Sequence, residues 1–135
     1  MFMHARGGPV QALQNNVLMI VARITGGGAA TDCTIDAGTG RGLSSVTYNA
    51  ATGCYRATFS HVPAGTFLGM GALGGCNSST AADAKTVCEL KGTFSAANKI
   101  VDFLVVDLGA TPALVDLATN EGLTLVFYFA ETAKP

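Results

Sequence analysis

The residues that could carry acid–base chemistry are few and lie far apart in the sequence. His61 stands in a turn-like stretch, and the carboxylates of interest are Asp102, Asp107 and Asp116. A histidine can move a proton and a carboxylate pair can hydrolyse a glycosidic bond, but both reactions need side chains at a defined separation. The positions of these four residues in the sequence do not indicate that their side chains lie at such a separation. We therefore predict no catalytic residues and expect that the protein is not an enzyme.

The four cysteines, Cys33, Cys54, Cys76 and Cys88, contain no closely spaced pair. Zinc sites usually combine such pairs with nearby histidines, so we predict no metal site. A cytosolic origin favours free, buried thiols. If one disulfide forms, the best candidate joins Cys76 to Cys88, which bracket a polar loop.

Two glycine-rich stretches, Gly26–Gly28 and Gly38–Gly42, have the composition of phosphate-binding loops. Neither is followed by the Lys-Ser or Lys-Thr pair that completes such a loop, so we interpret both as turns and predict no cofactor. Tyr48, Tyr55 and Tyr128 could line a sugar-binding surface, although aromatic residues at strand spacing more often fill a core.

The composition is apolar and poor in charge. Hydrophobic residues make up 49% of the chain, charged residues 13%, and the net charge is −1. The basic residues are scattered, which argues against nucleic-acid binding because that function needs clustered lysines and arginines. A surface with few charges promotes association, so we expect a homo-oligomer.

Neither a membrane span nor an export signal is apparent. The longest apolar run, Val17–Ala22, is far shorter than a bilayer requires. The first residues include an arginine but lack the apolar core of a signal peptide. We expect synthesis and folding in the cytosol.

Hydrophobic alternation predicts about eight short strands and one domain, an antiparallel β-sandwich or barrel-like fold over residues 16–135, jelly-roll-like in character. The run 16–25 is apolar on both faces and predicts a strand buried on both sides. Leu108–Glu121 is the one short helical candidate. The predicted strands lie at 16–25, 31–37, 45–49, 54–59, 66–73, 86–90, 100–106 and 123–130.

Two of these strands form a predicted hairpin, VTYNAATGCYRATF, around a short turn that contains Gly53. Alternation places Tyr55, Ala57 and Phe59 on its inward face, and Cys54 is expected to be a free thiol.

Residues 1–15 are predicted to form a flexible N-terminal arm, because Gly7-Gly8-Pro9 interrupts any regular element. One interpretation is a frayed terminus. The other is an arm that packs on a neighbouring subunit through its apolar residues, for which the candidates are Phe2, Met3, Val10 and Leu13.

The order of these elements resembles small virion proteins of tailed bacteriophages, notably capsid decoration, or cement, proteins. The similar stretches are GLSSVTY and GCYRATF, then KIVDFLVVD, and finally GLTLVFYF near the C-terminus, which together span about residues 38–130. The four cysteines and the arm depart from that pattern.

The resemblance implies a β domain on the outer surface of a phage head, made in the host bacterial cytoplasm. It implies a homo-trimer or other homo-oligomer that clamps neighbouring major capsid subunits and has no catalytic, cofactor or metal site. The alternative function is a phage fibre or adhesin-like module that binds host-surface glycans through its tyrosines.

Overall fold

The computed structural model describes residues 17–29, 31–77, 86–92, 94–107, 113–119 and 121–130, with the backbone alone for 74–77 and 86–89. These residues form nine strands and no helix. The strands are β1 (Val17–Thr25), β2 (Thr34–Ile35), β3 (Leu43–Asn49), β4 (Cys54–Phe59), β5 (Thr66–Asn77), β6 (Thr86–Leu90), β7 (Ile100–Asp107), β8 (Ala113–Leu114) and β9 (Gly122–Ala130).

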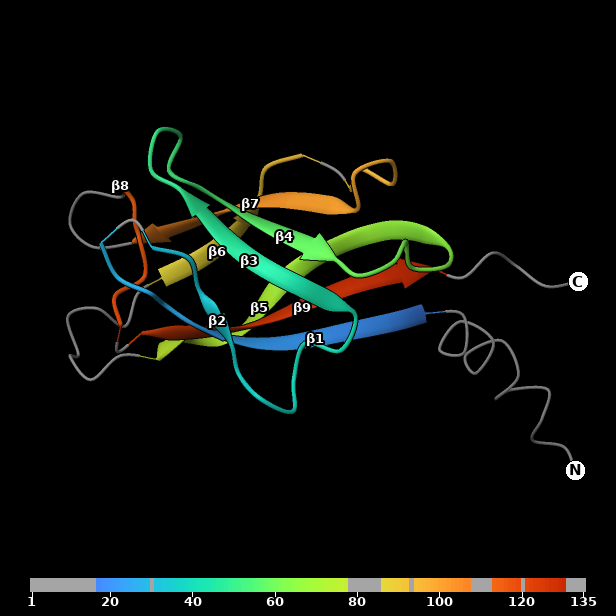
Figure 1. Cartoon of the computed structure of the whole chain (residues 1–135), viewed down its shortest axis with the longest axis horizontal. Coiled ribbons are helices and arrows are strands. Elements are labelled where there is room, and N and C mark those ends of the chain that lie inside the picture. The colour runs from blue at the N-terminus through green and yellow to red at the C-terminus, as the bar shows by residue number, and fades with distance from the viewer. Residues whose placement is uncertain are drawn as a thin grey trace, which may run out of the picture.

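The strands build two antiparallel sheets (Figure 1). Sheet A has the order β2-β1-β9-β5, and sheet B has the order β3-β4-β7-β6 with β8 paired to β7. The chain crosses from one sheet to the other between β2 and β3, between β4 and β5, between β5 and β6, and before β9. This arrangement confirms the predicted antiparallel β-sandwich, with two open sheets rather than a closed barrel.

The core lies between the sheets and is rich in aromatic side chains. Phe59 of β4 packs edge-on against Phe127 and Phe129 of β9, with ring centroids 5.2 and 5.8 Å apart. Tyr55, Ala57 and Phe59 are all buried, which confirms the predicted inward face of the hairpin. The alternation of apolar and polar residues therefore positions these side chains as expected.

The predicted turn of the hairpin is also present. β3 pairs with β4 in a register that places Tyr48 opposite Tyr55 and Asn49 opposite Cys54. The backbone N–H of Gly53 donates to the carbonyl of Asn49 at 2.8 Å, and Gly53 has a φ of 68°. This left-handed conformation favours glycine, so the turn closes where the sequence supplies one.

The prediction that 16–25 is buried on both faces is wrong. The inward residues Ile20, Ala22 and Ile24 are buried, but Val17, Met19 and Val21 are exposed by 38, 56 and 37%. The sandwich has only two layers, and the outward side of β1 faces away from the second sheet. Val17, Met19 and Val21 are called the β1 outer row below.

The helical candidate Leu108–Glu121 is wrong over the part that the structure describes, residues 113–119 and 121, while 108–112 and 120 lie outside it. Ala113 and Leu114 pair with β7, and no helix follows them. The N–H of Val115 donates to Val105 at 2.9 Å, and the N–H of Leu117 donates to the Tyr55 hydroxyl. The backbone thus bonds to sheet B instead of to its own preceding turn.

The strand expected over 31–37 is shorter than predicted. Only Thr34 and Ile35 form β2, after an isolated bridge between Cys33 and Val46. A turn begins at Asp36, whose carbonyl accepts from the N–H of Thr39 at 3.1 Å. Local turn bonding therefore ends the strand early.

Candidate functional site

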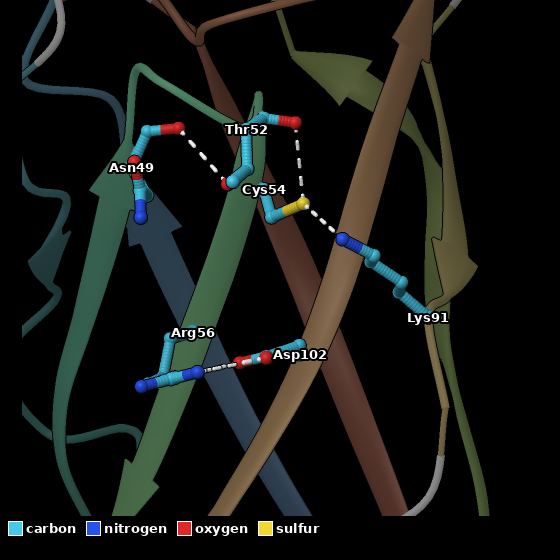
Figure 2. A network of polar contacts seen from close by, with 6 residues as sticks. All are labelled: Asn49, Thr52, Cys54, Arg56, Lys91 and Asp102. Atoms are coloured by element: carbon cyan, nitrogen blue, oxygen red, sulfur yellow. Dashed lines mark hydrogen bonds and ion pairs between the residues drawn. The ribbon is translucent and has the colours of Figure 1, made fainter.

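The main polar cluster of the described residues lies on the outward face of sheet B (Figure 2). Cys54 and Arg56 project outward from β4 because they alternate with the buried Tyr55 and Ala57. Lys91 follows β6 and reaches across β7, so that its Nζ lies 3.2 Å from the Cys54 Sγ. The cluster therefore draws on β4 and on the residue that follows β6, with β7 between these two strands.

The Cys54 thiol has two polar contacts. Its Sγ lies 3.4 Å from the carbonyl oxygen of Thr52, in addition to the contact with the Lys91 ammonium. The pKa of Cys54 lies below its ordinary value, first because of a hydrogen bond with the Thr52 side chain and further because of the contact and charge of Lys91, while burial opposes the shift. A lowered pKa raises the thiolate fraction near neutral pH, and the thiolate is the reactive form.

Arg56 and Asp102 form a two-bond ion pair beside this thiol. The Arg56 Nε lies 2.7 Å from one carboxylate oxygen of Asp102, and a terminal nitrogen lies 2.9 Å from the other. The two residues occupy opposed positions on β4 and β7. Hydrogen bonding to Arg56 lowers the pKa of Asp102, so the carboxylate stays ionised into acid.

A second polar contact is buried beneath sheet B. The hydroxyl of Tyr55 donates to a carboxylate oxygen of Asp116 at 3.0 Å and accepts from the N–H of Leu117 at 2.7 Å. Tyr55 is completely buried, and burial raises the pKa of its phenol. These bonds connect the segment after β8 to sheet B.

The structure does not assemble the acid–base residues considered from the sequence. His61 is exposed in the loop before β5, Asp102 is paired with Arg56, and Asp116 is bonded to Tyr55. Asp107 lies at the end of β7. In the described ranges no three His, Cys, Asp or Glu side chains gather as metal ligands, and no helix is long and apolar enough to cross a membrane.

The tyrosines do not share a surface. Tyr55 is in the core and Tyr48 packs on it with ring centroids 4.8 Å apart, whereas Tyr128 is half-buried on β9 of the other sheet. The burial of Tyr55 agrees with the favoured interpretation that aromatic residues at strand spacing fill the core. Their alternation with polar residues serves the core in β3 and β4.

Two of the cysteines are described as free thiols, namely Cys33 and Cys54. Desolvation raises the pKa of Cys33 to about 12, so it differs from Cys54 in reactivity. The side chains of Cys76 and Cys88 lie outside the described part, and their proposed disulfide stays a prediction. The arm residues also lie outside the described part, and their contact with a partner stays a prediction. These residues are Phe2, Met3, Val10 and Leu13.

Sheet A presents a different kind of outward face. The β1 outer row is apolar, and Leu68 and Leu73 on β5 are 58 and 57% exposed. The only charged residue in β1 is Arg23, and its Nε lies 3.8 Å from a carboxylate oxygen of Asp36. An apolar face of this kind is typical of association surfaces, while sheet B carries the ion pair and the thiol.

Comparisons with family models, with curated proteins and with solved structures found no match to this chain. The site is therefore described from its own geometry. Sequence spacing could not reveal it, because Cys54 and Lys91 are 37 residues apart and Tyr55 and Asp116 are 61 apart.

Proposed function

We propose that this chain is a structural virion protein, a decoration protein that binds the outer surface of a bacteriophage head. In this proposal a homo-trimer or other homo-oligomer clamps neighbouring major capsid subunits and stabilises the shell. The protein is made in the host bacterial cytoplasm and performs no catalysis.

The observation that carries the proposal is the β1 outer row. Three apolar side chains in one strand face solvent, and Met19 is more than half exposed. Burying apolar area contributes about 25 cal/mol per Å². Many copies on a repeating shell add avidity, so a modest contact at each copy is sufficient.

The experiment uses phage heads that lack decoration proteins, incubated with the purified chain. We expect the wild type to co-sediment with heads and to raise the temperature at which they open. Met19→Lys places a charge in the β1 outer row and should bind at least about tenfold more weakly. Ala51→Lys, at an exposed position in the turn between β3 and β4 of sheet B, is the matched control and should bind as the wild type does.

Heads that neither bind the chain nor gain heat resistance from it would refute the proposal. Binding to host cells or to a glycan array under the same conditions would instead favour the fibre or adhesin-like alternative. No described feature favours that alternative, since Tyr55 is buried and Tyr48 and Tyr128 belong to different sheets.

A further inference from the structure

Cys54 and Lys91 bring two nucleophilic groups into direct contact. The Lys91 Nζ donates to the Cys54 Sγ at 3.2 Å, and the two side chains point toward one another on the outward face of sheet B (Figure 2). Cys54 begins β4, and Lys91 follows the last residue of β6. Because 37 positions separate them in the sequence, the folded sheet is what places the sulfur beside the nitrogen.

The neighbouring residues explain why Lys91 turns toward the thiol. The N–H of Lys91 donates to the carbonyl of Asp102 at 3.0 Å, so the two residues are neighbours across the sheet. Both carboxylate oxygens of Asp102 already accept from Arg56, at 2.7 and 2.9 Å. Among the described residues no carboxylate forms an ion pair with Lys91, so none holds its amine away from the sulfur.

The sulfur of Cys54 is within reach of a small oxidant. Cys54 keeps 7% of its surface exposed, and Lys91 is itself exposed. A lysine side chain is flexible, so its movement opens a path for a molecule as small as hydrogen peroxide. The lowered pKa of Cys54 favours the thiolate, which is the form that peroxide oxidises.

The oxidised sulfur would contact an amine but no second thiol of the described residues. Cys33, the other thiol whose side chain the structure describes, packs against the core between the sheets, whereas Cys54 lies on the outward face. A sulfenic acid condenses with a thiol or with a nitrogen that it contacts. The Lys91 amine is therefore the group placed to react.

We propose that hydrogen peroxide joins Cys54 to Lys91 through a covalent sulfur–nitrogen bond, a sulfenamide. The bond crosses β7 and links the start of β4 to the end of β6. It needs no second protein, so it forms whether or not the chain binds a capsid.

The bond forms in two steps. In the first, the Cys54 thiolate attacks one oxygen of the peroxide, a sulfur–oxygen bond forms as the oxygen–oxygen bond breaks, and the departing hydroxide takes a proton from the Lys91 ammonium to give water. In the second, the neutral amine attacks the sulfur, and the hydroxyl leaves with a proton from the nitrogen as a second water. The sulfur loses two electrons overall and the peroxide gains them.

The bond closes a loop of the chain between residues 54 and 91. Closing a loop lowers the conformational freedom of the unfolded chain and so stabilises the folded one. The bond is reversible, because an added thiol attacks the sulfur and releases the Lys91 amine, and a second thiol resolves the mixed disulfide. The domain is therefore expected to resist urea better in oxidising than in reducing surroundings.

The test is peptide mapping of the full chain after mild treatment with hydrogen peroxide. Free thiols are blocked, and trypsin digests the chain without a reducing agent. We expect peptide 42–56, which contains Cys54, to be linked to peptide 86–99, with a mass two hydrogens below the sum of the two. The second peptide stays uncut at Lys91 because trypsin does not cleave after a lysine whose amine is bonded to sulfur. Dithiothreitol should separate the peptides.

Two variants and an unfolded sample serve as controls. Lys91→Arg keeps the charge but replaces the amine with a guanidinium, and it should remove the link. Lys99→Arg is the matched variant, because Lys99 contacts Ser60 instead, and it should link as the wild type does. The wild type unfolded in urea should not link. In urea denaturation, dithiothreitol should lower the midpoint of the linked wild type.

Three results would overturn the proposal. The first is oxidation of Cys54 without a link to Lys91, and the second is a linked product that retains an added oxygen. The third is a link to another cysteine, which the digest reveals because trypsin then cleaves after Lys91 and releases peptide 86–91. None of these results bears on binding to phage heads, which is measured separately.

Discussion

At the scale of single residues, Cys54 and Cys33 show how local surroundings separate two thiols. Cys54 meets the Lys91 ammonium on the outward face of sheet B, while Cys33 is half-buried and lies near Asp116. The two thiols therefore have pKa values shifted in opposite directions. We therefore expect the Cys54 thiol to ionise more readily than the Cys33 thiol.

We predict that Lys91→Met slows the alkylation of Cys54 by iodoacetamide near neutral pH. Loss of the ammonium raises the pKa of the thiol, so its pH–rate profile moves to higher pH. Mass spectrometry of the labelled peptides measures each cysteine separately. Cys33 should stay slow in both proteins, and Lys99→Met, a change outside the contacts of Cys54, should leave the Cys54 profile where it is. An unshifted profile in Lys91→Met would show that Lys91 does not act on the thiol.

A second prediction at this scale concerns the Tyr55 hydroxyl. Tyr55→Phe keeps the ring but leaves the buried N–H of Leu117 without its acceptor. We expect the free energy of unfolding to fall by about 1–3 kcal/mol, measured by urea denaturation. Tyr48→Phe is the matched control, since the Tyr48 hydroxyl makes no hydrogen bond to the described chain. Equal stability of Tyr55→Phe and the wild type would contradict this role.

At the scale of elements, the Arg56–Asp102 pair connects β4 to β7 on the surface of sheet B. The pKa of Asp102 is lower in the folded chain than in the unfolded one. Its contribution to stability is therefore present above the ordinary carboxylate pKa and is lost as the pH falls through the lowered value.

We predict that Asp102→Asn costs about 0.5 kcal/mol of unfolding free energy at pH 7, a small value because both side chains are partly exposed. The difference from the wild type should disappear in acid, where Asp102 is protonated. Urea denaturation across pH gives the comparison. A double-mutant cycle with Arg56→Gln isolates the pair, and a cycle without coupling energy at pH 7 would contradict it.

The elements also show what the sequence could predict. Alternation predicted the strands β3, β4 and β9 and the inward side of β4, because side-chain direction is fixed by period two. Alternation could not say that the outward side of β1 lacks a third layer. The segment after β8 was misjudged because its partners, Val105 and Tyr55, are distant in the sequence. The polar clusters were missed for the same reason.

At the scale of the whole molecule, the two outward faces of the sandwich differ. Sheet A exposes the β1 outer row, and sheet B exposes an ion pair and Lys91. The few charged side chains of the chain are thus unevenly distributed over the two described faces. Association through sheet A leaves sheet B facing solvent.

We predict that the wild type associates in solution and that Met19→Lys lowers its average mass at the same concentration, because a charge would be buried in the contact. Sedimentation equilibrium measures the mass. Ala51→Lys adds the same charge in the turn between β3 and β4 of sheet B and should behave as the wild type does. Equal masses for all three proteins would place the contact elsewhere.

The pairing of β1 with β9 has a consequence for synthesis. Val17 lies opposite Ala130, so almost the whole described chain must leave the ribosome before sheet A can close. Until then the nascent β1 has no β9 to cover its apolar residues, and chaperones have a period in which to bind it. Contacts between residues so distant in the chain are expected to make folding slow, on the scale of milliseconds to seconds after release.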